Sequence, residues 1–398
     1  MKINTDDKKI KELISKGVEE IIEKKSLVQK LKSGKKLRVK LGIDPTGPKI
    51  HIGRALQFQK LKQFQELGHQ IILIIGDFTA QIGDASDKQA MRKPLSEKEI
   101  KENMKSYKEQ IGKIINLEKT EIHYNSEWFN KMKLKEIISL AMNFTAQQMI
   151  QRKNFKERWD SNKPIGLHEL LYPLLQGYDS VMVKADIEIG GSDQLFNLKT
   201  GREIQKIFNQ PQQDIITLKM LYGTDGRKMS TSWGNIITII DKPFDIFGKI
   251  MSMKDELIPH YLELCTDVPL KEIKKIEKDL SSKKVNPKEI KIKLAKEIIK
   301  NYYNKKEADE AEKEFNKIFV KKEIPTETKE IKINEKNIPF LDLLVKTGLA
   351  PSKSEAKRLI LQNAVKIDNK VLNDWKKNIE IKKGMIIQVG KRKFIKIN

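Results

Sequence analysis

Residues 44–54, Asp-Pro-Thr-Gly-Pro-Lys-Ile-His-Ile-Gly-Arg, constrain the fold of this chain more than any other stretch. They follow the β-rich run 37–43 and precede apolar residues at helical spacing over 56–67. A buried strand, a turn rich in Pro and Gly and then a helix form the layout of an anion site, because the helix start presents free N–H groups. Gly53, which has no Cβ, would let a flat ligand approach the backbone closely. Taken alone, such a turn is equally compatible with a purely structural role.

The hydrophobic pattern predicts a parallel α/β sheet. The stretches 37–43, 71–75 and 120–124 are the expected parallel strands, and helical patterns separate them. Ligands on such sheets bind at the carboxyl ends of strands, which is where Asp44 and the stretch 76–84 fall. The same pattern predicts three more elements, namely a packing helix over 8–31 and strands over 181–189 and 215–221.

The composition is that of a soluble globular protein with two or three domains. Of the 398 residues, 33% are charged, and the longest apolar run, 71–75, is far too short to span a bilayer. The N-terminal stretch has no apolar signal-peptide core, and Cys265 is the single cysteine, which agrees with the reducing cytoplasm. A net charge of +24 suits nucleic-acid binding, although a general lysine bias would give the same charge.

A second motif lies far downstream, where Lys-Met-Ser-Thr-Ser occupies 228–232 between two glycines. With His-Ile-Gly-Arg at 51–54, it resembles the KMSKS and HIGH signatures of class I aminoacyl-tRNA synthetases. The segments 172–179, Tyr-Pro-Leu-Leu-Gln-Gly-Tyr-Asp, and 190–194, Gly-Gly-Ser-Asp-Gln, look like the amino-acid pocket of the tyrosyl-tRNA synthetase family. Four ordered motifs cover most of the expected catalytic half, so the resemblance is specific. It implies a Rossmann-like catalytic sheet.

The resemblance also implies tyrosine–tRNA ligase activity. L-Tyrosine and ATP would give tyrosyl-adenylate and pyrophosphate, and the tyrosyl group would then pass to the 3'-terminal adenosine of tRNA(Tyr). The attacking carboxylate is already ionised, so catalysis requires positioning and charge stabilisation but no general base. Mg²⁺ is expected with ATP as a substrate complex, with no tightly bound cofactor and no dedicated metal site. Because the family is generally homodimeric, we expect a homodimer.

Individual residues take their expected roles from the same resemblance. The catalytic residues around the triphosphate are Thr46, His51, Arg54, Lys228 and Thr231. The ATP-binding residues are Asp44, Gly53, Lys88, Arg92, Gly191, Asp193, Met229 and Ser230. The tyrosine-binding residues are Lys40, Asp84, Tyr172, Gln176, Asp179 and Gln194. The resemblance implies that Tyr172, Gln176 and Asp84 hold the substrate ammonium and that Asp179 accepts a hydrogen bond from the phenol. Tyr172, Gln176 and Asp179 are spaced four and three apart, so one helix face can present all three.

Three positions depart from the family pattern. Arg54 stands where the first signature usually ends in His, and Thr231 stands where the second usually has Lys. We hypothesise that Arg54 supplies positive charge that Thr231 lacks. Lys40 stands where many bacterial members have a Tyr on the phenol, a variant similar to a second bacterial subgroup. Recognition of the phenol would therefore depend more strongly on Asp179.

The chain is expected to continue beyond the catalytic domain, 1–242, with a helical anticodon-side domain, 243–320, and a charged linker, 321–337. The remainder, 338–398, resembles a small RNA-binding module found in a ribosomal protein and at the C-terminus of many bacterial tyrosyl synthetases. From 331 onward, 16 Lys plus Arg oppose 6 Asp plus Glu, a net charge of +10. The expected RNA-binding residues are Lys353, Lys357 and Arg358.

Three alternatives remain open from the sequence. A tryptophanyl synthetase shares the signatures, but an indole offers no hydroxyl for Asp179 to recognise. A degenerate paralogue would have lost activation, although Thr46, His51 and Lys228 are all present. An RNA-binding protein could also use the scaffold and the basic C-terminal module without catalysis. Amino-acid-dependent pyrophosphate exchange separates these possibilities.

Overall fold

The computed structural model describes residues 3–84, 95–229, 233–320, 328–390 and 393–398. The chain forms two compact units, Met1–Ala308 and Asp309–Asn398, each with its own internal contacts. Within the described ranges, no helix combines the length and the apolar character needed to cross a membrane. The finer boundaries expected at 242, 320 and 337 stay predictions.

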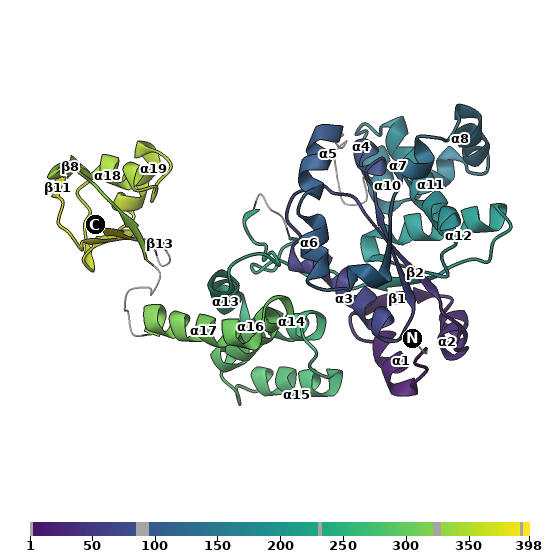
Figure 1. Ribbon diagram of the computed structural model, residues 1–398, viewed down its shortest axis with the longest axis horizontal. Helices are drawn as coiled ribbons and strands as arrows, with labels where there is room; N and C mark the ends of the chain where they lie inside the picture. The colour runs from purple at the N-terminus through teal and green to yellow at the C-terminus, as the bar shows by residue number, and fades with distance from the viewer. Residues whose placement is uncertain (1–2, 85–94, 230–232, 321–327, 391–392) are drawn as a thin grey trace. The chain divides into compact units, whose positions relative to one another are not determined.

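A six-stranded sheet forms the centre of the first unit (Figure 1). Its spatial order is β1-β6-β5-β2-β3-β4; all neighbours are parallel except β1 and β6, which are antiparallel. The strands are β1 (Val18–Ile22), β2 (Arg38–Ile43), β3 (Gln70–Ile75), β4 (Thr120–Tyr124), β5 (Ile187–Gly191) and β6 (Asp214–Leu218). The predicted α/β fold class is therefore confirmed.

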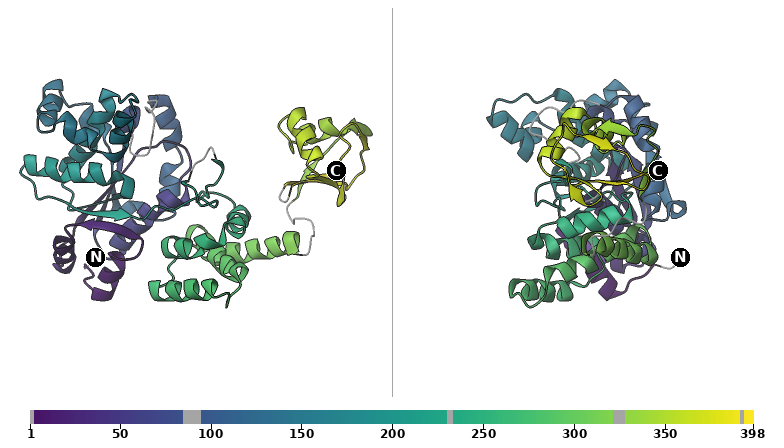
Figure 2. Two further views of the ribbon diagram at one scale, coloured as in Figure 1. Left: turned by 180° about the vertical axis from the view of Figure 1, so that it is seen from behind. Right: turned by 90° about the vertical axis from the view of Figure 1, so that its left-hand side faces the viewer.

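Helices cover this sheet on both sides (Figures 1 and 2). They are α1 (Asp7–Leu13), α2 (Lys24–Lys32), α3 (Ile52–Glu66), α4 (Thr79–Ile82), α5 (Glu97–Met104), α6 (Tyr107–Gly112), α7 (Ser126–Phe129), α8 (Leu134–Ala141), α9 (Ala146–Ile150), α10 (Lys153–Asp160), α11 (Leu167–Met182) and α12 (Leu195–Ile207). A helical portion follows, with α13 (Pro243–Ser252), α14 (Ile258–Cys265), α15 (Leu270–Ser281), α16 (Pro287–Tyr302) and α17 (Lys305–Phe315). The mainly helical pattern expected after 243 is confirmed.

Two sequence-based expectations about secondary structure were wrong. The helix expected over 8–31 is interrupted by β1, because Gly17 adopts φ +68° and the chain then pairs with β6. A positive φ is favourable for glycine, and it ends the helical course. The strand expected over 181–189 begins only at Ile187, because α11 continues to Met182.

Helix α11 lies directly against α12. A Cβ placed on Gly177 would be 3.0 Å from the Cα of Gly201, so these glycines allow the two backbones to approach closely. On the other side, Leu175 of α11 packs with Ile72 and Ile74 of β3. The helix is therefore fixed between the sheet and α12, which limits where its polar side chains can point.

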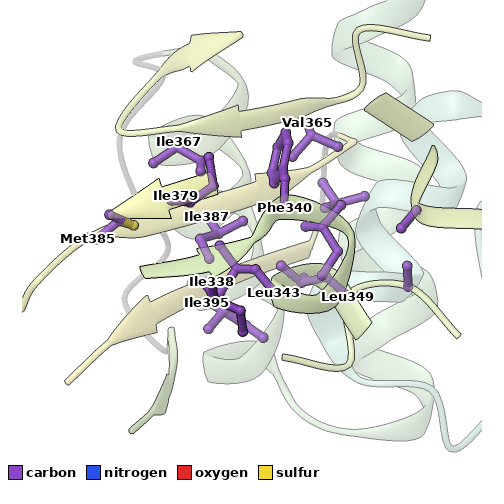
Figure 3. Packing of buried hydrophobic residues seen from close by; sticks show 14 of the residues in the cluster. Ile338, Phe340, Leu343, Leu349, Val365, Ile367, Ile379, Met385, Ile387 and Ile395 are labelled. Carbon is purple, nitrogen blue, oxygen red and sulfur yellow. The ribbon is translucent and has the colours of Figure 1, made fainter. Parts of the chain in front are cut away.

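The second unit encloses a separate apolar core (Figure 3). Its five-stranded sheet has the order β10-β9-β12-β13-β7, and a two-stranded sheet pairs β11 with β8. The elements are β7 (Lys329–Ile331), β8 (Asn337–Pro339), α18 (Phe340–Lys346), α19 (Lys353–Leu361), β9 (Val365–Ile367), β10 (Lys370–Val371), β11 (Asn378–Glu380), β12 (Ile386–Val389) and β13 (Lys393–Ile397). Strand β7 pairs with β13, so the sheet begins within the stretch expected to be a linker.

Candidate active site

Backbone hydrogen bonds join the first signature to the stretch 237–239, which follows the second signature. The N–H of Ile52 donates to the carbonyl of Ile237 at 2.8 Å, and the N–H of Ile239 donates to the carbonyl of Ile50 at 3.0 Å. A Cβ on Gly53 would lie 3.0 Å from the sulfur of Met229, so glycine lets the downstream loop pack against the start of α3. The segment that carries Lys228 therefore lies beside the first signature.

A cavity of about 630 Å³ opens at the carboxyl ends of β2 and β5. Its walls include most of the residues expected at the ATP and tyrosine subsites: Asp44, Thr46, His51, Gly53, Arg54, Asp84, Tyr172, Gln176, Asp179, Gly191, Asp193, Gln194, Lys228 and Met229. Lys40 is absent from this lining. Lys88, Arg92, Ser230 and Thr231 lie outside the described residues.

His51 forms the N-cap of α3. Its Nδ1 accepts a hydrogen bond from the N–H of Arg54 at 3.2 Å. Burial, with a smaller effect from the Arg54 charge, lowers the pKa of His51 to about 4. The ring is therefore neutral at pH 7 and, since Nδ1 is the acceptor, carries its proton on Nε2. His51 can thus act as a neutral hydrogen-bond donor but not as a cation.

The guanidinium of Arg54 is bound to the turn before α3. Its Nη2 donates to the hydroxyl of Thr46 at 3.3 Å, and its Nη1 donates to the carbonyl of Asp44 at 3.3 Å. Nη1 also donates to the hydroxyl of Tyr107 at 3.2 Å, and burial raises the pKa of that tyrosine. A permanent positive charge therefore lies beside Thr46, one of the expected triphosphate contacts.

Asp44 connects this turn to α11. Its Oδ2 accepts a hydrogen bond from the hydroxyl of Tyr172 at 3.0 Å, and its Oδ1 accepts one from the hydroxyl of Thr79 at 2.8 Å. Burial raises the pKa of Tyr172 well above its usual value, so the hydroxyl keeps its proton as a donor. Asp44, which is expected to bind ATP, is therefore hydrogen-bonded to Tyr172, which is expected to bind the substrate tyrosine.

Two residues that the sequence did not single out hold several of the expected tyrosine-binding residues in place. Arg152, 4% exposed, donates to Asp84 Oδ1 at 2.8 Å, and Gln194 donates to the other carboxylate oxygen. Asn197 donates to the amide oxygens of Gln176, at 2.8 Å, and of Gln194, at 3.1 Å. Because Arg152 lies between α9 and α10 and Asn197 lies on α12, no single local motif contains both.

Asp179 lies at the buried end of the cavity and is 3% exposed. Trp128 Nε1 donates to Oδ1 at 3.0 Å, and Asn125 Nδ2 donates to Oδ2 at 3.5 Å. Burial raises the pKa of Asp179 to about 7, while the charge of Lys40 and the two hydrogen bonds act in the opposite direction. Asp179 thus has the position expected of a residue that recognises a substrate hydroxyl inside the protein.

Family models match both units. The model described as tRNA synthetases class I (W and Y) matches residues 32–320, and the model for the tyrosine–tRNA ligase SYY-like C-terminal domain matches 314–397. The chain therefore belongs to the class I tRNA synthetases of the tryptophan and tyrosine family.

Two relatives of similar length are tyrosine–tRNA ligases. A tyrosine–tRNA ligase of Carboxydothermus hydrogenoformans is 48% identical, covering 97% of each chain. That of Thermotoga maritima is 44% identical, covering 97% of this chain and 96% of the relative. In fold, the chain resembles a tyrosyl-tRNA synthetase from Archaeoglobus fulgidus complexed with L-tyrosine, with a TM-score of 0.62 and 21% identity over 76% of this chain and 98% of the other.

The pKa of Asp179 predicts pH-dependent tyrosine binding. An ionised carboxylate accepts a phenol hydrogen bond, and the ionised fraction falls as the pH drops below about 7. Tyrosine affinity should therefore weaken progressively from pH 8 to pH 6, as measured by equilibrium dialysis. Asp179→Asn should bind more weakly and lose this pH dependence. An affinity that stays constant over this range would contradict the proposed role of Asp179.

The hypothesis about Arg54 predicts that its removal lowers activity and that a cation at position 231 restores part of that activity. Arg54→Ala should lower the rate of tyrosine-dependent pyrophosphate exchange by about 100-fold, the usual effect of removing a transition-state donor. Arg54→His should also lose activity, and Arg54→His with Thr231→Lys should recover part of it, because the second change returns a cation. An unchanged rate in Arg54→Ala, or no recovery in the double variant, would refute the hypothesis.

Proposed function

We propose that this chain is a tyrosine–tRNA ligase, which activates L-tyrosine with ATP and transfers the tyrosyl group to the 3'-terminal adenosine of tRNA(Tyr). Its near-full-length similarity to tyrosine–tRNA ligases supports this function. The structural observation that carries the proposal is Asp179, an almost fully buried acceptor at the end of the cavity. Asp179 would recognise the phenol, and residues of both signatures line the same cavity.

The ATP side of the cavity provides donors and cations. Thr46 offers a hydroxyl, His51 a neutral ring N–H, and Arg54 and Lys228 positive charge. Such groups can stabilise the charge that builds on the α-phosphate as the tyrosine carboxylate attacks it. The negative charge leaves with pyrophosphate, and Mg²⁺ arrives with ATP as part of the substrate complex. The chain's task is to align the carboxylate and the phosphorus for this displacement.

The tyrosine side explains discrimination against phenylalanine. With phenylalanine bound, the buried Asp179 carboxylate would keep its Trp128 and Asn125 donors but lose the hydrogen bond from the substrate. Losing a hydrogen bond to a buried charged group costs free energy, and tyrosyl synthetases are themselves a standard example of this principle. An indole also offers no hydroxyl, so the same argument disfavours a tryptophanyl synthetase.

Pyrophosphate exchange measured with each of the twenty amino acids tests the proposed activity. We expect exchange with tyrosine alone, and a sharp loss in Asp179→Asn. Exchange with tryptophan alone would establish the competing specificity. The absence of exchange with every amino acid would favour an RNA-binding protein without activation.

An exposed apolar face supports the expected homodimer. Leu134 and Ile138, one helical turn apart on α8, are 73% and 51% exposed, and Met142 just beyond is 80% exposed. On the neighbouring α11, Leu167 is 82% exposed. Contiguous exposed aliphatic side chains are characteristic of protein interfaces. We propose that a second copy of the chain covers this face, as the generally dimeric family suggests.

The dimer proposal predicts that Ile138→Glu weakens self-association. Placing charge in an apolar interface carries a desolvation cost, so the variant should sediment as a monomer at concentrations where the wild type is dimeric. Val371→Glu, at a site 47% exposed on β10, is the control and should sediment as the wild type does. A wild type that is monomeric at micromolar concentration would rule the dimer out.

Helix α19 offers a basic surface for tRNA. Lys353 pairs with Asp342 at 2.5 Å, and Arg358 pairs with Glu355 at 2.5 Å. Exposed ion pairs of this kind are weak, so phosphates can replace the acidic partners. Lys357 lies 4.2 Å from the ring centroid of Trp375, so an aromatic surface adjoins the charges. We propose that this face contacts tRNA and that the enzyme acts in the cytoplasm.

A further inference from the structure

Lys40, expected among the tyrosine-binding residues, is enclosed by protein atoms. Its side chain is 0% exposed, and its ammonium donates to Ser180 Oγ at 2.7 Å and to the Gln176 carbonyl at 2.9 Å. The third partner is Glu188 Oε1, also at 2.9 Å. Three donors therefore meet three acceptors, which leaves no N–H of Lys40 for a substrate.

Glu188 is enclosed in the same way. It is 1% exposed and faces Lys40 across the parallel pair β2–β5, where the two residues are register partners. Its Oε2 accepts hydrogen bonds from Ser180, at 3.2 Å, and from Gln213. A buried ion pair is often no more stabilising than apolar side chains of similar volume. A contribution to folding stability is thus a weak explanation for this ion pair. The groups that it positions offer a better one.

The pair holds the turn of α11 that carries Asp179. Lys40 bonds to Gln176 and Ser180, which lie on either side of Asp179 in that turn. Its positive charge lowers the pKa of Asp179, whereas the negative charge of Glu188 raises it. The other groups that influence Asp179 are neutral donors, namely Trp128 of α7 and Asn125 before it, while Tyr172 on the same helix keeps its proton.

We propose that Lys40 and Glu188 form a positioning pair for tyrosine selection, which fixes the Asp179 turn and sets the charge behind it without touching the substrate. This inference rests on the proposed function and gives Lys40 an indirect role. The competing view is direct contact between the ammonium and the phenol. The two views differ in what happens when both charges are removed together.

Steady-state pyrophosphate exchange distinguishes the two views. Lys40→Met leaves Glu188 uncompensated near Asp179, so the KM for tyrosine should rise by about tenfold or more, the scale of one pKa unit. The KM for ATP should stay close to the wild-type value, and the preference for tyrosine over phenylalanine should fall. In Lys40→Met with Glu188→Gln, the repulsion is removed and most of the tyrosine affinity should return. A direct contact would predict no return.

The pH profile supplies a measurement that general structural damage would not reproduce. The inflection in KM for tyrosine should move to higher pH in Lys40→Met and to lower pH in Glu188→Gln, because the two charges act on Asp179 in opposite directions. Glu188→Gln also keeps the proposal testable if Lys40→Met fails to fold. Shifts of both variants in the same direction would overturn it.

Arg158→Met is the matched control. Arg158 is 1% exposed and pairs with the equally buried Glu169 at the start of α11, but neither residue lines the cavity. This variant should lose stability while keeping the wild-type KM for tyrosine and its pH profile. An equal rise in KM in Arg158→Met would mean that any buried pair on α11 has this effect, which overturns the proposal. Absence of tyrosine-dependent exchange in the wild type would instead refute the proposed function.

Discussion

The short backbone pairing between residues 50–52 and 237–239 is the constraint on which the candidate site depends. Two hydrogen bonds connect segments that are nearly two hundred residues apart, so the turn after β2 and the loop after β6 share one cavity. Gly53 makes the contact possible, since a side chain there would meet Met229. The wall of this cavity therefore includes residues of both signatures, which neither segment would provide alone.

The local parts of this arrangement follow from the sequence. Strand β3 is a nearly continuous apolar run, β2 and β4 are short strand-like stretches between helical patterns, and the turn after β2 has the Pro and Gly pattern of a strand-to-helix connection, so these parts could be predicted. Segment β1 could not, because the apolar spacing over 8–31 suits a helix, and only the positive φ of Gly17 and pairing with β6 select a strand. Local sequence pattern predicts secondary structure least well where pairing with a strand distant in the sequence determines the conformation.

The same distinction explains which site residues could be predicted. Those within motifs, such as Tyr172 and Asp179, were identifiable because one helix presents them at fixed spacing. Trp128 and Arg152 lie on other parts of the chain and donate to the cavity residues Asp179 and Asp84, so only tertiary structure reveals them. Lys40 shows a further limit of prediction from sequence. Its position in the motif suggests that it lines the pocket, but the register of β2 with β5 places Glu188 beside its ammonium.

One residue connects the two expected substrate subsites. Asp44 accepts the Tyr172 hydroxyl through its side chain, while its backbone carbonyl accepts the Arg54 guanidinium. A ligand that displaces either neighbour would therefore act on the same residue. Under the proposed assignment of the two subsites, binding of one substrate would change the residue that the second substrate meets, so the two binding free energies should not be additive.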